Sequence, residues 1–279
     1  MPEEIDTEEK LKKKIKEVME RINNDKEKVN LTDSDARFMK GGDGKVNVGY
    51  NCQAAVTEGQ IIVSSEVINE ANDRKALKEM VETAEENLGE EIKEVAADTG
   101  YSSYENYEYL AERGKIGYIP DQKMGRMRGE EVGAYHQDNF KYDKKSDEYI
   151  CPEGQRLKRY KERRTDAAYR KWRQVIYQGA ACTSCAAKAQ CTRQRYRTIA
   201  RNDGRELLEQ MRERLKTKEG RRKYLQRLYT VEPPFGHFKH NLGYRYFLLR
   251  GLEKVRAEFR LMCVGFNLKK MNQLLMATG

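Results

Sequence analysis

The sequence predicts an α/β fold, because strand and helix signals alternate over residues 46–120. Residues 46–69 read as two strands joined by a Gly-bearing turn at 58–60. An amphipathic helix, a short strand that stops at Asp98, a second helix and another short strand follow. This order of hairpin, helix, strand, helix and strand is typical of α/β domains.

Ahead of this region, residues 5–30 predict one charged amphipathic helix with a narrow apolar seam that needs a packing partner. Its apolar positions recur at three- and four-residue steps. They are Leu11, Ile15, Val18, Met19 and Ile22. Residues 30–45 are rich in Asp, Ser and Gly, so we expect a loop there.

Beyond the hairpin, Asn72 and Asp73 are expected to cap a helix over 74–88. The next predicted elements are a strand over 91–98, a helix over 103–113 and a strand over 114–120.

Residues 203–275 predict helices. Pro233 and Pro234 directly follow Glu232, and proline is tolerated in the first turn of a helix, so a new helix is expected to start there. The last helix has a stripe expected to face the core. Its members are Leu252, Val255, Phe259, Met262, Phe266 and Leu268.

The charge is unevenly distributed along the 279 residues, whose formal net charge is +9. Residues 155–260 are dense in Arg and Lys, and a polyanion is the natural partner because neutralised phosphates release counterions. Any single basic run is also compatible with a solvated helix face. Tyrosines interleaved with the arginines favour nucleic acid. They are Tyr160, Tyr169, Tyr196, Tyr224, Tyr244 and Tyr246.

No apolar stretch is long enough to span a membrane, and the first residues lack the apolar segment of a signal peptide. We therefore expect a cytoplasmic protein without a membrane partner. In a reducing cytosol the six cysteines are not expected to form disulfides.

Four of these cysteines lie in a segment poor in apolar runs, and two of them have the C-x2-C spacing. They are Cys151, Cys182, Cys185 and Cys191. Four thiolates can hold one Zn²⁺ tetrahedrally, which would stabilise a small module without a good core. The alternative is four loop or core thiols without metal. Cys52 and Cys263 are expected to act as small apolar residues outside any site.

Two carboxylates are candidates for catalysis. Asp98 stands where a strand ends, the usual place for catalytic groups in α/β sheets, and Glu232 stands among basic residues at a helix junction. Carboxylates that share a divalent metal serve phosphodiester hydrolysis and transesterification. For either acid alone, a surface carboxylate or a helix cap is the simpler interpretation.

Two stretches carry a family resemblance: ADTGYSS at 97–103, and VEPPFGHFKH with RGLEKV between 231 and 255. With the hairpin sequence, NLTDSDARFMK and the cysteine-bearing insertion, they resemble the C-terminal catalytic region of DDE transposases of bacterial insertion sequences. That resemblance covers nearly all of residues 30–275.

The resemblance implies a ribonuclease-H-like fold, a mixed sheet flanked by helices, in which Asp, Asp and Glu bind two Mg²⁺ or Mn²⁺ ions. Asp98 matches the second Asp and Glu232 the Glu. Tyr224, Arg227 and Lys239 resemble the DNA-contacting signature around that Glu, although four residues separate Arg227 from Glu232 where three are commoner. His237 and Arg245 are expected to join them at the DNA.

The first Asp of that triad has no match, and Thr57 stands where many relatives have an Asp. Asp33 and Asp35 lie in the turn-rich segment, outside the triad. The sequence therefore looks like the C-terminal portion of a transposase, from a truncated or split gene. It divides into a charged helix over 1–29, a first catalytic part over 30–120, a cysteine-containing insertion over 121–200 and C-terminal catalytic helices over 201–279.

Three functions fit these features. The first is metal-dependent strand cleavage and transfer between element ends and target DNA, in a homo-oligomer on DNA near the nucleoid, with this chain inactive alone. The second is a non-catalytic DNA-binding remnant of the same fold. The third is a zinc-containing, basic nucleic-acid-binding module that was never an enzyme.

Overall fold

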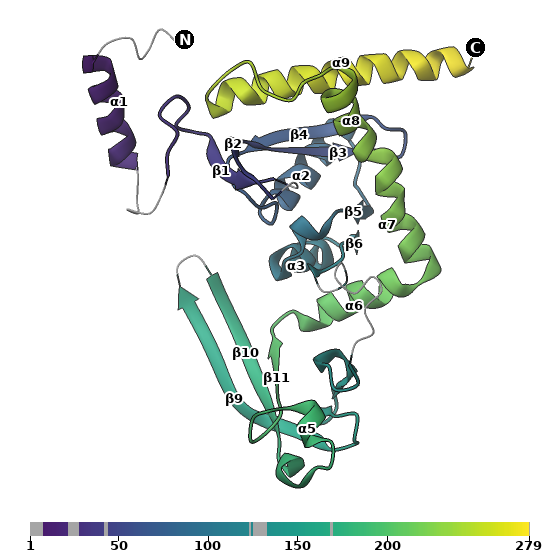
Figure 1. Ribbon diagram of the computed structural model, residues 1–279. Helices are drawn as coiled ribbons and strands as arrows, with labels where there is room; N and C mark the ends of the chain where they lie inside the picture. The colour runs from purple at the N-terminus through teal and green to yellow at the C-terminus, as the bar shows by residue number, and fades with distance from the viewer. Residues whose placement is uncertain are drawn as a thin grey trace. The chain divides into compact units, whose positions relative to one another are not determined.

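A computed structural model describes residues 8–21, 28–41, 44–122, 124, 133–167 and 170–278. Contacts within the chain define two compact units. The first comprises Met1–Ile119 and Thr217–Gly279, and the second comprises Pro120–Lys216. Both units contain helices and strands (Figure 1), which confirms the α/β prediction. None of the described helices combines the length and apolar character needed to cross a membrane.

The strands of the first unit form three pairs. β1 (Arg37–Lys40) pairs with β2 (Val46–Gly49), β3 (Asn51–Val56) pairs with β4 (Ile62–Ile68), and β5 (Glu94–Ala96) pairs with β6 (Ile116–Tyr118). Only the β5–β6 pair is parallel. Two predictions were wrong: residues 30–45 contain β1, and residues 46–49 belong to the β1–β2 hairpin. Local turn signals in 30–45 hid a strand whose partner comes later in the chain.

Three helices of this unit confirm predicted elements. They are α1 (Glu8–Arg21), α2 (Ala76–Leu88) and α3 (Tyr104–Glu112). Residues 5–7 and 22–27 of the first predicted helix, Ile22 included, lie outside the described residues. The predicted cap of α2 was wrong, because its N-cap is Lys75, which makes no side-chain capping bond. The carboxylate of Asp73 instead accepts hydrogen bonds from the side-chain amides of Asn51 and Gln53.

The C-terminal part of this unit is helical, as predicted, with α7 (Lys218–Thr230), α8 (Glu232–Gly236), a π-helical turn η5 (His237–Asn241) and α9 (Leu252–Thr278). The prolines at 233 and 234 occupy the first turn of α8, which confirms that a helix starts there.

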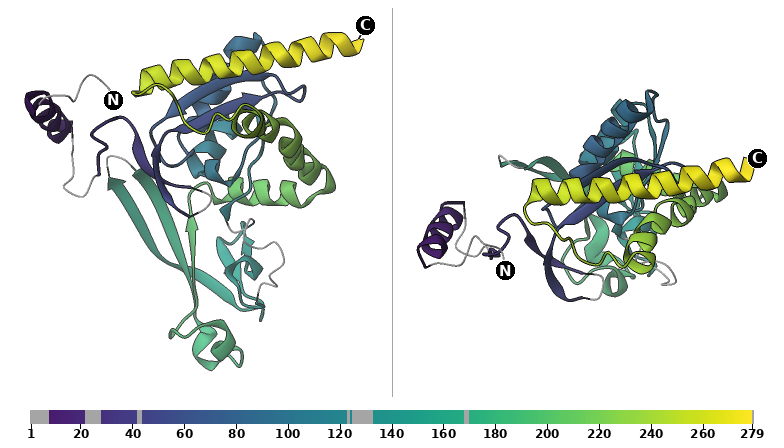
Figure 2. Two further views of the ribbon diagram at one scale, coloured as in Figure 1. Left: turned by 45° about the horizontal axis from the view of Figure 1, so that its top comes forward. Right: turned by 90° about the horizontal axis from the view of Figure 1, so that it is seen from above.

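Helix α9 lies across the β3–β4 hairpin (Figures 1 and 2). The core between them contains Ile62, Val67, Phe238, Val255, Phe259 and Cys263. The predicted stripe is therefore correct for Val255 and Phe259, but Leu268 is 63% exposed. Asn267 bonds the backbone of Ile62 at the start of β4, so it faces the hairpin. Its neighbour Leu268 is turned by about 100° around the helix and points away.

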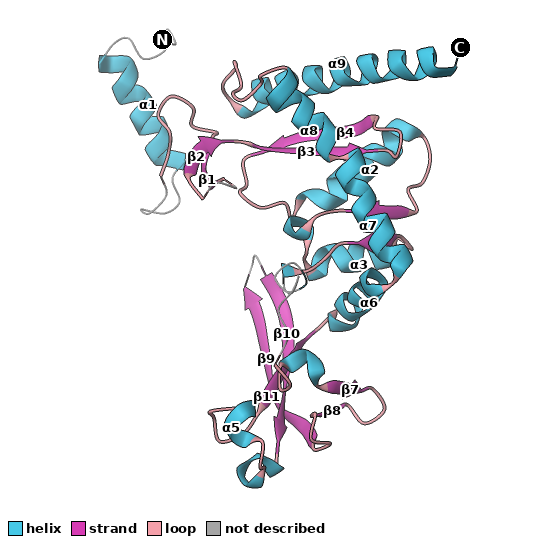
Figure 3. Cartoon of the chain, turned by 45° about the vertical axis from the view of Figure 1, so that its right-hand side comes forward, coloured by secondary structure: helices cyan, strands magenta, loops and turns pink. Residues whose placement is uncertain are grey.

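The second unit is built on an antiparallel sheet in the order β11-β10-β9-β8-β7 (Figure 3). Its strands are β7 (Lys141–Asp143), β8 (Glu148–Ile150), β9 (Arg156–Ala167), β10 (Arg170–Gly179) and β11 (Thr198–Asn202). It also contains α5 (Lys188–Cys191) and α6 (Arg205–Lys216). The sequence suggested no good core here. The structure shows a tyrosine-rich one, made of Phe140, Tyr149, Leu157, Val175, Tyr177 and Ile199.

Candidate active site

Asp98 lies two residues after the end of β5 (Glu94–Ala96) and caps the helical turn η2 (Thr99–Tyr101). Its backbone is extended, and its side-chain Oδ1 accepts a 2.7 Å hydrogen bond from the backbone N–H of Gly100. Asp98 is half-buried. The turn thus fixes one carboxylate oxygen of Asp98.

A second carboxylate lies beside Asp98. A Cβ atom placed on Gly100 would lie under 3.0 Å from both Asp73 Oδ2 and Asp98 Oδ1, so the two carboxylates flank this glycine. The sequence did not mark Asp73 as a site residue, because Asn72-Asp73 precedes a helix and resembles a cap. Its position 25 residues before Asp98 gives no local signal of their contact.

A buried polar network holds the Asp98 turn. Gln53 is only 3% exposed, and its Nε2 donates to Asp73 Oδ1 over 2.8 Å. The hydroxyl of Tyr101 donates to Gln53 Oε1. Burial raises the pKa of Tyr101 well above its usual value, and the charges of Asp73 and Asp98 raise it further. Tyr101 therefore stays a neutral donor.

Helix α7 runs beside β5. Nζ of Lys223 lies 2.6 Å from Oε2 of Glu94, and this bond lowers the pKa of that carboxyl group. One turn further along α7, the guanidinium of Arg227 lies 5.1 Å from the ring centroid of Tyr224, within cation–π range. The buried Nε of Arg227 has no hydrogen-bond partner in the part of the chain that the structure describes.

Glu232 is the first residue of α8, and its side chain is 57% exposed. Its Oε1 lies 3.9 Å from Nη1 of Arg227. Asp98 and Arg227 line one cavity of about 470 Å³. Val231, which directly precedes Glu232, and Phe235 of α8 also line it. Arg227 is therefore the residue that connects the surroundings of the two predicted acids.

The other predicted DNA-contacting residues follow α8. The His237 ring lies 5.7 Å from that of Phe266, and its Nδ1 is 3.0 Å from Asn241 Nδ2. Burial, aided by the charge of Lys269, lowers the pKa of His237. Lys239 and Arg245 are exposed. The structure thus presents two of these cations to solvent and packs the histidine against α9.

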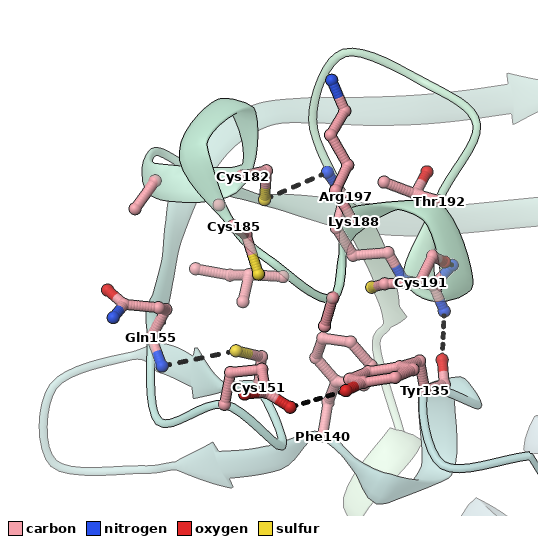
Figure 4. Close-up of a pocket in the computed structure, with 15 residues that line it drawn as sticks. Tyr135, Phe140, Cys151, Gln155, Cys182, Cys185, Lys188, Cys191, Thr192 and Arg197 are labelled. Carbon is pink, nitrogen blue, oxygen red and sulfur yellow. Dashed lines mark hydrogen bonds between the residues drawn. The ribbon is translucent and has the colours of Figure 1, made fainter.

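The four predicted zinc ligands line one small cavity of about 30 Å³ in the second unit (Figure 4). Sγ of Cys151 accepts a 3.3 Å bond from the backbone N–H of Gln155, and Sγ of Cys182 accepts a 3.4 Å bond from that of Arg197. Burial raises the pKa of Cys191, and the other three thiols add to this effect. The cysteines are therefore neighbours, although far apart in sequence.

Within the described ranges, no three His, Cys, Asp or Glu side chains are grouped closely enough to hold a metal. The zinc site predicted from the sequence is thus not preformed. For a magnesium site, Asp98 and Glu232 supply the hard oxygen ligands that this cation prefers, and they fit it by chemistry.

The structure thus brings Asp98, at a strand end, and Arg227 to one cavity of a mixed α/β unit, with Glu232 beside Arg227. Residues 150–272 match the family described as a transposase DDE domain, a stretch that includes Glu232 but not Asp98. Over these residues the match confirms the resemblance to DDE transposases drawn from the sequence. No curated protein and no solved structure matches the chain.

Proposed function

We propose that this chain carries the ribonuclease-H-like catalytic region of a DDE transposase, which cuts and joins DNA strands with Asp98 and Glu232 as its acids. The main observation that supports this proposal is that Asp98 and Arg227 line one cavity and that Glu232 lies 3.9 Å from Arg227. A site of this kind would act on element ends and target DNA at the nucleoid.

The geometry of α7 and β5 supports a short distance between the two acids. The Lys223–Glu94 ion pair places the two elements side by side at that level. Along α7, eight residues from Lys223 to Val231 advance about 12 Å, at about 1.5 Å per residue. Along β5, four residues from Glu94 to Asp98 advance about 13 Å, at about 3.3 Å per residue. Val231 and Asp98 line the same cavity, which supports a position of the start of α8 near Asp98.

Asp98 and Glu232 would hold the Mg²⁺ or Mn²⁺ ion, which when bound activates the attacking oxygen and stabilises the leaving one. Arg227 is suited to bind a phosphate, because its buried Nε has no partner among the described residues and its only ion pair is the 3.9 Å contact with Glu232. Gly100 and Gln53 position the carboxylate of Asp98 through the turn.

The β9–β10 ribbon is the best candidate for a DNA-contacting surface in the second unit. Its exposed Lys158, Lys161 and Arg163 have no acidic partner among the described residues. Tyr160, 65% exposed, stands at the irregularity in the β9–β10 register. A two-stranded β-ribbon fits the major groove, and cations on it contact phosphates without reading sequence.

We also propose that the four cysteines bind one Zn²⁺. Two of the sulfurs accept backbone N–H bonds, and all four cysteines line one cavity, so zinc binding would require rotation of their side chains to Zn–S distances of about 2.3 Å. Zinc would then connect the turn at residues 151–154 to the loop between β10 and β11.

The second candidate function, a non-catalytic DNA-binding remnant, is favoured by the number of acids. Asp98 and Glu232 are two acids, whereas a two-metal site needs more bridging ligands, and the third nearby carboxylate, Asp73, already accepts bonds from Asn51 and Gln53. We therefore expect magnesium to bind weakly and residues 1–279 alone not to nick DNA. The test is incubation of the purified chain and its Glu232→Gln variant with supercoiled plasmid that carries the element's ends, with Mg²⁺ or Mn²⁺.

Cleavage that depends on metal and disappears in Glu232→Gln would support the catalytic function and refute inactivity of the chain alone. Absence of cleavage, together with metal-independent DNA binding that is unchanged in Glu232→Gln, would support the remnant.

A further inference from the structure

Helix α9 has a second apolar face besides the one that packs on the β3–β4 hairpin. Its members recur at alternating steps of three and four residues, and their side chains are between 50% and 72% exposed. They form the outer face of α9 and are Leu261, Val264, Leu268, Met271 and Leu275. Large apolar side chains exposed singly are normal, whereas several on one helix face form a patch of the kind that marks interaction sites.

The outer face lies nearly opposite the packed face. At about 100° per residue, its centre is about 160° around the helix from that of Val255, Phe259 and Cys263, which belong to the core at the hairpin. Helix α9 lies on the outside of the first unit (Figure 2). A second molecule can therefore reach the outer face without disturbing the core.

The spacing of the outer face is that of a coiled-coil seam. Alternating steps of three and four residues place its side chains at the a and d positions of a heptad. Side chains at these positions insert into holes that are each formed by four residues of a facing helix. An α-helix is therefore the partner that this spacing fits.

The outer face carries no charge, although 35% of the chain's residues are charged. Two cations of the same stretch of α9 are bound within the chain. Nη2 of Arg260 lies 3.0 Å from Oε2 of Glu66. Nζ of Lys270 donates to Oε1 of Gln60 over 2.8 Å. An uncharged face does not attract DNA, because phosphates bind through cations. Two copies of this chain, each with a net charge of +9, can meet there without setting like charges against each other.

The outer face is complementary to itself when two copies of α9 run antiparallel. A two-fold axis level with Phe266 brings a positions of one helix opposite d positions of the other. Large side chains then face smaller or flexible ones, and every pair is apolar. The pairs, each formed twice, are Val264 with Leu268, Leu261 with Met271, and Ala257 with Leu275.

Gly265 lies beside this axis. Glycine in a helix interior is less stable than alanine, and a Cβ atom added at Gly265 would meet nothing within 4 Å. Packing within the described part of the chain therefore gives no reason for a glycine at this position. Close approach of a second helix gives one, because the missing side chain lets two backbones come together.

We propose that the outer face of α9 binds the same face of a second copy of this chain, as an antiparallel helix pair with two-fold symmetry. About twelve positions of each helix would lie in the contact, namely the a, d, e and g positions from 257 to 275. Standard complexes bury about 20–30 residues on each side, so this dimer is of the weak class and should dissociate at micromolar concentrations. The pairing goes beyond the proposed function, since it needs neither DNA nor metal.

The test is sedimentation equilibrium of the full chain without DNA or divalent metal, from about 1 to 100 µM. We expect the mass to rise with concentration from that of one chain to that of two. Leu268→Gln should raise the dissociation constant of the dimer by on the order of 100-fold, because symmetry places the substitution in the interface twice. Glu232→Gln should dimerise like the wild type, so failure of catalysis and failure of this proposal remain distinguishable.

The matched control is Leu248→Gln. It makes the same chemical change at a leucine that is 84% exposed and lies before α9, so the dissociation constant should not change. Leu268 is on the surface, and circular dichroism should show that Leu268→Gln folds like the wild type. If Leu268→Gln fails to fold, Val264→Gln makes the same test.

Cysteine cross-linking tests the orientation of the two helices. A mixture of Leu261→Cys and Met271→Cys proteins should form a disulfide between the two variants under mild oxidation, because these positions face each other. Met271→Cys alone should not, since the antiparallel register separates its two copies by ten residues, about 15 Å along the helix. Wild-type protein treated in the same way measures any linkage through the native cysteines.

Several results would overturn the proposal. One is a chain that stays monomeric at about 100 µM, and another is a dimer that both Leu268→Gln and Val264→Gln leave intact. A disulfide in Met271→Cys alone would refute the antiparallel pairing, and masses beyond two chains would indicate unspecific apolar association. Loss of the dimer in Ile15→Gln would show that α1 of the second copy is the occupant instead.

Discussion

The carboxylates of Asp73 and Asp98 flank Gly100 so closely that no side chain fits there. A Cβ atom at this position would lie under 3.0 Å from an oxygen of each. Residue 100 is therefore a glycine because two acids occupy the space that a side chain would need.

Gly100→Ala should displace one of these carboxylates and weaken Mn²⁺ binding by on the order of tenfold, since a bridging carboxylate would leave its position. Mn²⁺ titration followed by electron paramagnetic resonance measures this. The control is Gly265→Ala in α9, where an added Cβ meets nothing within 4 Å. That variant should keep Mn²⁺ affinity and gain about 0.5–1 kcal/mol of stability. Equal Mn²⁺ affinity in Gly100→Ala and the wild type would show that the displaced carboxylate is not a ligand.

We predict that the carboxylates of Asp98 and Glu232 lie within roughly 4 to 8 Å of each other when Mn²⁺ is bound, as acids that share a metal must. A crystal structure of the chain with Mn²⁺ measures the distance. Two side chains on opposite faces of the first unit would refute both this prediction and the proposed function.

Zinc content should depend on Gly179. A Cβ atom there would lie 2.7 Å from Sγ of Cys182, so Gly179→Ala should displace that thiol. We expect about one zinc per purified wild-type chain and a large loss in Gly179→Ala, by metal analysis. Cys52→Ser is the control, because Cys52 lies on β3 in the other unit. Wild-type protein with far less than one zinc per chain would exclude the site.

DNA affinity should fall steeply with salt and show little sequence preference. Lys161→Gln with Arg163→Gln should reduce the slope of log affinity against log salt by roughly 2, because each phosphate contact contributes about 0.9. Arg156→Gln is the control, since Arg156 is already paired with Glu148 at 2.9 Å. Fluorescence anisotropy over a salt series measures the slopes, and equal slopes in all variants would place the DNA elsewhere.

Lys115 is a buried cation of the first unit, and its replacement should lower the free energy of unfolding. Its side chain is 1% exposed and bonds Glu85, whose pKa is lowered first by this bond and then by the N–H of Ile92. Lys115→Met should cost about 3 kcal/mol at neutral pH by leaving the Glu85 carboxylate unpaired. Arg113→Met is the control: Arg113 is 53% exposed and 3.9 Å from Glu85, so its loss should cost less than about 1 kcal/mol.

The pH dependence follows from the lowered pKa of Glu85. Its contribution to stability is fully present above its unfolded pKa, about 4.3, and is lost as pH falls through the lower folded value. The difference between wild type and Lys115→Met should therefore shrink below about pH 4. Urea unfolding followed by circular dichroism at several pH values measures this, and a difference independent of pH would contradict the assignment to Glu85.

The sequence by itself determined the features that depend on near neighbours in the chain. The periodicity of residues 74–88 and the short apolar run before Asp98 predicted α2 and β5, and the two prolines after Glu232 predicted the start of α8. These signals are local, because helix and strand periods and the fixed φ of proline act within a few residues.

Tertiary structure decided the rest. Asp73 has the sequence of a helix cap, yet its carboxylate is held by Asn51 and Gln53 and lies beside Asp98. The strand within 30–45 forms because β2 supplies its hydrogen bonds, and Leu268 is exposed because α9 turns it away from the hairpin. Each of these outcomes depends on a partner distant in sequence, whose position is set by packing and by the need to pair backbone groups, and no local pattern encodes it.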